Sequence, residues 1–115
     1  MSSSKIGYCR VSTTGQNMTA QLDLLNNSGC QEIFKEKLSG SNIARPELRK
    51  LLDYIRKGDT VTVTKLDRLA RSTKDLLNIA EEIKKKGADL EVLNINLDTK
   101  SPTGQLMLTN AGRHR

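Results

Sequence analysis

The sequence has few histidines and cysteines, two residue types from which many catalytic sites are built. Its 115 residues include one histidine, His114, and two cysteines, Cys9 and Cys30. A triad in which a carboxylate orients a histidine to activate a serine is therefore not expected. The spacing of the two cysteines matches no metal motif and gives no disulfide framework. We expect both to be reduced structural thiols.

Other absences narrow the class of protein. No apolar run approaches the roughly 18 to 20 residues of a membrane span, and the start "MSSSKIGY" lacks the apolar core of a signal peptide, so a cytoplasmic location is expected. No G-x-x-x-x-G-K-[ST] loop is present, which argues against nucleotide hydrolysis. The acidic residues are scattered, with no H-E-x-x-H motif. A site without metal or other cofactor is predicted.

Positive charge is the feature that the chain does have. Nineteen Lys and Arg stand against 13 Asp and Glu, which gives a net charge of +6 and an isoelectric point near 9.6. This balance favours an acidic partner such as nucleic acid. The length is that of one domain with a modest core.

The apolar pattern alternates between strand and helix. Short apolar runs predict strands at 5–12, 32–34, 60–64 and 89–95. Apolar residues at helical spacing predict helices from Met18, from Pro46 and after Ser72, with Gly29 ending the first. Ser72 and Asp75 form a capping pair, and Ser101 with Pro102 predicts one more helix start.

Alternation of this kind, with connections long enough for crossovers, specifies an α/β fold. We expect a mainly parallel sheet of four to five strands with helices on both faces. The stretch "KLSGSNIAR" at 37–45 carries small and polar residues and is predicted to be an exposed loop.

The stretch "TKLDRLARST" at 64–73 concentrates cations after the third strand. Ligands of such sheets bind beyond the carboxyl ends of the strands. Arg10 and Ser12 end the first strand, whereas Asp67, Arg68 and Arg71 follow the third. If these strands are neighbours, one hydroxyl and three guanidinium groups converge on one edge.

Such a set is suited to phosphoryl transfer. Guanidinium groups bind non-bridging phosphate oxygens and stabilise the charge of the transition state. Ser12 would then attack the phosphorus and form a phosphoserine. The alternative is that Ser12 is a turn hydroxyl and that Arg68 and Arg71 are a solvated pair at a helix start. A phosphatase built on Cys9 is not favoured, because the loop after it has no arginine at its far end.

Three motifs together resemble the catalytic domain of serine site-specific recombinases, the resolvase and DNA invertase group. They are "YCRVSTTGQNMTAQ", "KLSG" followed by Arg45, and "KLDRLAR", in the family's order and separation. The resemblance runs from about Lys5 to Thr109, and "DTKSPTGQLMLT" is closer to the invertase branch.

The resemblance implies a role for each matching residue. Ser12 would be the nucleophile that joins the 5′ phosphate, and Arg10, Arg68 and Arg71 would hold the scissile phosphate. Gln21 would orient Ser12 or the phosphate, and Asp67 would position the arginines or help protonate the leaving oxygen. Further family positions, the last two on a mobile loop, are matched by Gln16, Ser39 and Arg45. The family needs neither metal nor nucleotide, acts on a DNA recombination site, and works as a homodimer and tetramer.

The resemblance also predicts the domain organisation. Residues 1–100 would form the catalytic domain, and 101–115 would begin the family's long dimerisation helix. Asn110 and Gly112 interrupt the apolar pattern there, so we expect a truncated helix or an atypical tail, with the helix-turn-helix DNA-reading domain absent.

Two other hypotheses stay open at this point. The chain could be a catalytically inactive recombinase fragment that acts only as an interaction module. It could also be an unrelated small phosphate-binding α/β module, in which case the three motifs match by coincidence.

Overall fold

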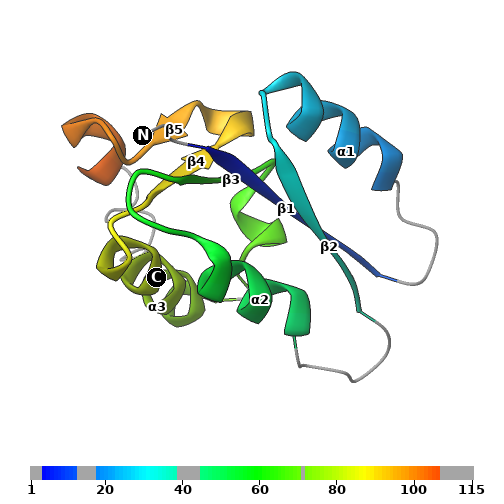
Figure 1. The fold of residues 1–115 in the computed structure, drawn as a ribbon, viewed down its shortest axis with the longest axis horizontal. Coiled ribbons are helices and arrows are strands. Elements are labelled where there is room, and N and C mark those ends of the chain that lie inside the picture. The colour runs from blue at the N-terminus through cyan, green and yellow to red at the C-terminus, as the bar shows by residue number, and fades with distance from the viewer. Residues whose placement is uncertain (1–3, 13–17, 39–44, 71, 107–115) are drawn as a thin grey trace.

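The computed structural model describes residues 4–12, 18–38, 45–70 and 72–106. A five-stranded sheet runs through it in the order β2-β1-β3-β4-β5 (Figure 1). Its strands are β1 (Lys5–Ser12), β2 (Glu32–Leu38), β3 (Thr60–Val63), β4 (Asp89–Val92) and β5 (Leu97–Asp98). β1 pairs in parallel with β2 and β3, and β3 with β4, whereas β5 is antiparallel to β4. The predicted mainly parallel sheet is confirmed.

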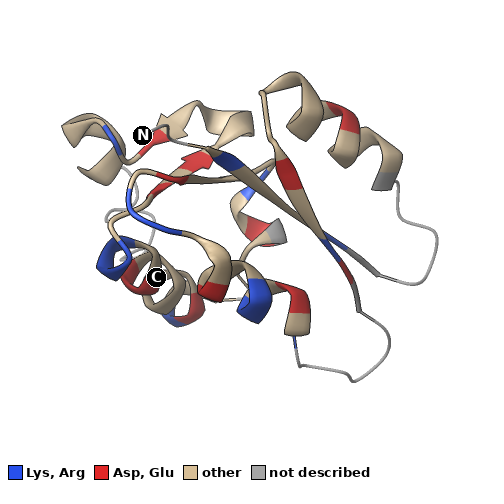
Figure 2. Cartoon of the chain, in the orientation of Figure 1, with Lys and Arg blue, Asp and Glu red and all other residues tan. Residues whose placement is uncertain are grey.

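Helices cover both faces of the sheet, as predicted (Figure 1). α1 (Met18–Asn27) lies on one face, and α2 (Pro46–Tyr54) and α3 (Thr73–Lys85) lie on the other. The predicted local signals hold: Gly29 has a φ of 98° after α1, and the Ser72 hydroxyl accepts a hydrogen bond from the Asp75 N–H at 3.1 Å. Both signs of charge are spread over α2 and α3 (Figure 2).

Two predicted strands have different ends in the structure. β2 continues to Leu38, through residues predicted to be loop, because each of its residues pairs with one of Ile6–Ser12 in β1. β4 ends at Val92 instead of residue 95. Leu93–Ile95 form a short 3-10 helix, η2, and Asn96 takes a left-handed φ of 51°, which turns the chain back into β5.

The main apolar core lies between the sheet and the pair α2 and α3. Buried side chains on one side of β1 and β3 meet the apolar stripes of both helices, among them Leu51 and Ile79. The opposite face has a smaller contact between β1 and α1. Gly7 allows that contact, because a Cβ there would lie 3.2 Å from a methyl group of the buried Leu25.

A further helical segment follows β5. Residues 102–106 are helical, and the Ser101 hydroxyl accepts a hydrogen bond from the Gly104 N–H at 2.9 Å, so the predicted helix start is confirmed. A Cβ on Gly104 would lie 1.9 Å from the backbone oxygen of Asp98. Among the described residues, no helix combines the length and hydropathy needed to cross a bilayer.

Candidate active site at the carboxyl edge of β1 and β3

The first condition for a site is met, because β1 and β3 are parallel neighbours. Their carboxyl ends therefore lie at one edge of the sheet. The 3-10 helix η1 (Leu66–Arg68) follows β3 and lies against β1. The Arg10 guanidinium donates to the backbone oxygen of Asp67, which joins the end of β1 to η1.

The structure places the predicted residues to different extents. Arg10 and Asp67 are brought together directly, with the Asp67 side chain exposed. Ser12 is the last residue of β1, and Arg68 is the last residue of η1. The remaining predicted positions outside the described residues are Gln16, Ser39 and Arg71.

Gln21 lies on α1 and is buried, with 8% of its surface exposed. Its side-chain nitrogen donates to the backbone oxygen of Arg10 at 3.3 Å. Its Oε1 has no hydrogen-bond partner among the described residues. A buried acceptor without a donor costs free energy, so Oε1 is the atom of Gln21 that a further donor would stabilise.

Sequence reasoning missed a buried carboxylate on β2, opposite Arg10 in the pairing of β1 with β2. Glu36, at 2% exposure, accepts hydrogen bonds from the Tyr8 hydroxyl at 3.0 Å and from the N–H groups of Leu48 at 3.1 Å and Glu47 at 3.2 Å. These N–H groups belong to the first turn of α2, where a negative charge is stabilised. Burial, followed by the charge of Glu36, raises the pKa of Tyr8, so its hydroxyl stays a donor.

A signal for Glu36 was present in the sequence. The helix at Pro46 starts after Arg45, which has no side-chain oxygen to accept from the first N–H groups, and no side-chain cap is made by this residue. The first N–H groups of such a helix need an acceptor from elsewhere in the chain or from water. Only the tertiary structure identifies that acceptor as Glu36.

Arg45 reaches from the start of α2 to the start of α3. Its Nη1 donates to the backbone oxygen of Leu69 at 2.9 Å, and its Nη2 lies 2.8 Å from each carboxylate oxygen of Asp75. The side chains of Arg45 and Asp75 are 14% and 23% exposed. The sequence predicted Arg45 as a site residue but gave no partner for it.

The cysteines do not take part in this edge as nucleophiles. Both are free, Cys9 is buried, and burial raises its pKa to about 11. Burial also raises the pKa of Cys30. Both thiols therefore stay protonated at neutral pH, which fits the predicted structural role. In the part of the chain that the structure describes, no three metal-ligating side chains gather where they could hold an ion.

Comparison with known proteins identifies the family. The family model described as "Resolvase, N terminal domain" matches residues 5–113. The chain belongs to the resolvase family of serine recombinases. This resolvase-family chain is 44% identical over 105 residues to the transposon Tn552 DNA-invertase BinR of Staphylococcus aureus, a match that covers 90% of the chain and 55% of the relative.

Two further similarities concern another sequence and a solved structure. The serine recombinase gin of Escherichia phage Mu is 45% identical over 100 residues, which cover 87% of the chain and 52% of that relative. The crystal structure of the N-terminal catalytic domain of TP901-1 integrase matches with a TM-score of 0.74 and 32% identity, over 91% of this chain and 88% of that one. The resolvase-family chain thus spans about half the length of these curated relatives and most of a solved catalytic domain.

Proposed function

We propose that this resolvase-family domain cuts and rejoins DNA strands through a covalent 5′-phosphoserine at Ser12, in site-specific recombination of the invertase or resolvase type. The observation that carries the proposal is the junction at which Arg10 of β1 donates to the backbone of Asp67 in η1. This junction brings the strand that ends at Ser12 beside η1, which contains the first two residues of "DRLAR".

The reaction requires a nucleophile and positive charge around one phosphate. The Ser12 oxygen forms a bond to phosphorus while the bond from phosphorus to the 3′ oxygen breaks. The proton that the serine loses is balanced by the proton that the 3′ oxygen gains. The number of ester bonds on the phosphate is unchanged, so rejoining consumes no nucleotide and the proposal includes no metal or other cofactor.

The arginines supply the electrostatic part of this proposal. Arg10, Arg68 and Arg71 hold the non-bridging oxygens and stabilise the added charge of the transition state. Each such group lowers the activation free energy by about 3 kcal/mol in a site that excludes water. Asp67 positions these arginines or helps to protonate the 3′ oxygen. DNA is the proposed partner, which agrees with the net charge of +6.

The remaining positions orient the reactants. The unpartnered Oε1 of Gln21 is suited to accept from the Ser12 hydroxyl, since its amide is already tied to the backbone of Arg10. Gln16, Ser39 and Arg45 are proposed to contact the substrate phosphate or its neighbours. We also propose that the dimer and tetramer of the family apply to the whole protein rather than to residues 1–100 alone.

The test is a covalent adduct. The chain and a Ser12→Ala variant are incubated with nicked and mismatched DNA duplexes that carry invertase recombination sites. We expect a protein-DNA adduct that survives denaturant, with the DNA mapped by mass spectrometry to the peptide that contains Ser12. A chain that needs assembly should form the adduct once a relative's long helix and DNA-reading domain are appended.

The control separates chemistry from binding. Ser12→Ala should bind the duplex with unchanged affinity and give no adduct. An adduct formed equally by Ser12→Ala, or no adduct even from the extended protein, would refute Ser12 as the nucleophile. Thermal unfolding of both proteins, recorded in parallel, verifies that the substitution leaves the fold intact.

A further inference from the structure

Arg45 is already engaged by the protein's own atoms. Both of its terminal nitrogens have partners, Leu69 for Nη1 and Asp75 for Nη2. Leu69 lies directly after η1, and Asp75 lies in the first turn of α3. One side chain therefore joins the start of α2, the segment after η1 and the start of α3.

The geometry of the guanidinium group determines how these contacts affect the binding of an anion by Arg45. The group presents two edges that can bind an anion with two parallel hydrogen bonds, one formed by Nε with Nη2 and one formed by Nη1 with Nη2. Nη2 belongs to both edges, and it is the nitrogen that lies 2.8 Å from both oxygens of Asp75. A phosphate that binds either edge therefore has to share Nη2 with Asp75 or displace it, and the two anions repel each other at that distance.

Asp75 is held in place for this contact. Its backbone N–H donates to the Ser72 hydroxyl at 3.1 Å, which fixes it in the first turn of α3. The pair is mostly buried, so water screens its attraction less than that of a surface pair. Another bridge between the same helices differs, since Arg49 lies 2.7 Å from Glu82 with about half of both side chains exposed.

We propose that Asp75 is a positioning residue that holds Arg45 in a resting state and competes with the substrate phosphate for its binding edges. Phosphate binding exchanges one anion for another on Arg45 and thereby releases its bridge to α3, while the bridge between Arg49 and Glu82 remains. This inference rests on the proposed function for the identity of the phosphate as DNA. The competition itself follows from the contacts of Nη2.

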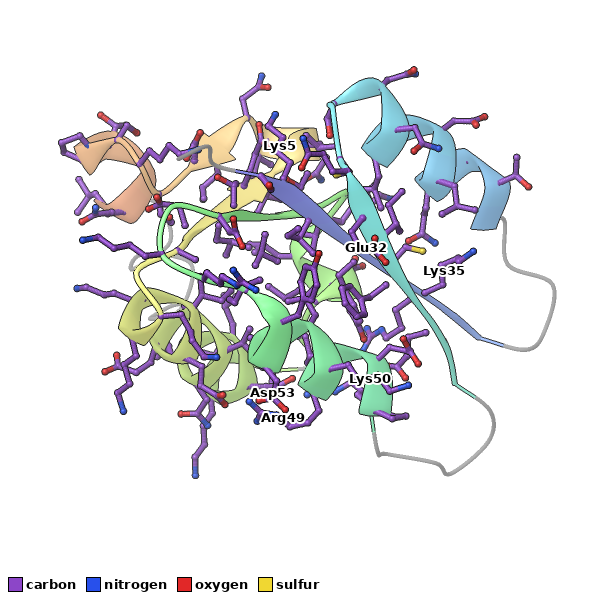
Figure 3. All side chains as sticks on the ribbon, viewed as in Figure 1. Lys5, Glu32, Lys35, Arg49, Lys50 and Asp53 are labelled. Carbon is purple, nitrogen blue, oxygen red and sulfur yellow. The ribbon has the colours of Figure 1, made fainter. Side chains whose placement is uncertain are left out.

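The experiment compares Asp75→Asn with Glu82→Gln. Each variant raises the net charge by one on the same helix, but only the first removes the negative charge that faces Arg45. Arg49, the partner of Glu82, is labelled beside Asp53 on α2 in Figure 3. The arginine side-chain nitrogens are followed by NMR during a titration with inorganic phosphate. We expect Asp75→Asn to tighten phosphate binding at Arg45 about fivefold, and Glu82→Gln to leave it unchanged.

Two further variants complete the test. Arg45→Gln combined with Asp75→Asn should lose the gain, and Asp75→Ser should reproduce it if Asp75→Asn does not fold. Equal phosphate affinity in Asp75→Asn, Glu82→Gln and the wild type would overturn the proposal. So would weaker binding in the folded Asp75 variants, because Asp75 would then aid phosphate binding.

The DNA reaction gives a separate readout. The Ser12 adduct should form about fivefold faster with Asp75→Asn than with Glu82→Gln. If no protein forms the adduct while Asp75→Asn still binds phosphate more tightly, the proposed function fails and the competition stands. If the adduct forms at equal rates and phosphate binding is equal, the proposed function stands and the competition fails.

Discussion

The two faces of the sheet are built differently. The face under α2 and α3 buries a continuous apolar cluster. On the face under α1 the buried Leu25 and Cys9 are not part of that cluster, and α1 approaches β1 closely at Gly7. The difference indicates that α2 and α3 supply most of the stability, whereas α1 is placed to hold Gln21 against the backbone of Arg10.

The largest expected effect tests the face under α2 and α3. Leu51 is fully buried, and Leu51→Ala should lower the free energy of unfolding by about 3 kcal/mol through lost burial and a cavity. Urea unfolding followed by circular dichroism measures it. Leu77→Ala, on the exposed side of α3, is the matched control and should cost less than about 0.5 kcal/mol. Equal losses would contradict the assignment of the core.

The next effect concerns the buried carboxylate of Glu36 on β2. Glu36→Ala removes the acceptor of Tyr8 and of two N–H groups of α2, and should cost about 2 to 3 kcal/mol in unfolding free energy. Glu32→Ala is the control, since Glu32 is exposed on the same strand (Figure 3). Glu36→Gln should recover part of the loss, because its amide oxygen still accepts. An unchanged free energy of unfolding in Glu36→Ala would show that these hydrogen bonds make no net contribution to stability.

A smaller effect tests the face under α1. A Cβ at Gly7 would lie 3.1 Å from the Cys30 sulfur and 3.2 Å from side-chain atoms of Ile33 and Leu25. Gly7→Ala should therefore cost about 1 to 2 kcal/mol in unfolding free energy. Combining it with Leu25→Val, which shortens one of these neighbours, should cost less than the sum of the two single changes. Strict additivity would place the strain elsewhere.

The smallest effect is a pH dependence on the same face. Burial raises the pKa of Cys9 from 9.0 to about 11, so the folded state keeps a proton that the unfolded state loses first. Stability from this group is complete below pH 9 and falls as pH rises toward 11, by about 1 kcal/mol at pH 10. Urea unfolding at pH 8 and pH 10 should show a steeper loss for the wild type than for Cys9→Ala. Parallel losses would contradict the shifted pKa.

Local signals were the part of the structure that could be predicted. Ser72 with Asp75 and Ser101 with Pro102 predicted helix starts correctly, because capping depends on neighbouring residues. The meeting of Arg10 with the segment after β3 was predicted from topology.

Contacts between distant segments could not be predicted in the same way. Glu36 looks like any charged strand residue until the start of α2 is placed over it. The pairing of Arg45 with Asp75 joins positions 30 residues apart, and no local pattern specifies it. The reversal at Asn96 was missed because its left-handed backbone follows a run whose apolar residues favoured a longer strand.

The contact of Gly104 with the backbone of Asp98 has a consequence for which sequences this fold tolerates. Any side chain at position 104 would overlap a main-chain oxygen, and no rotamer can relieve that overlap. In a saturation mutagenesis library selected for folded protein, position 104 should retain glycine alone, whereas the exposed neighbours Thr103 and Gln105 should accept many residues. The path of the chain from β5 into the following helix therefore depends on one residue, Gly104.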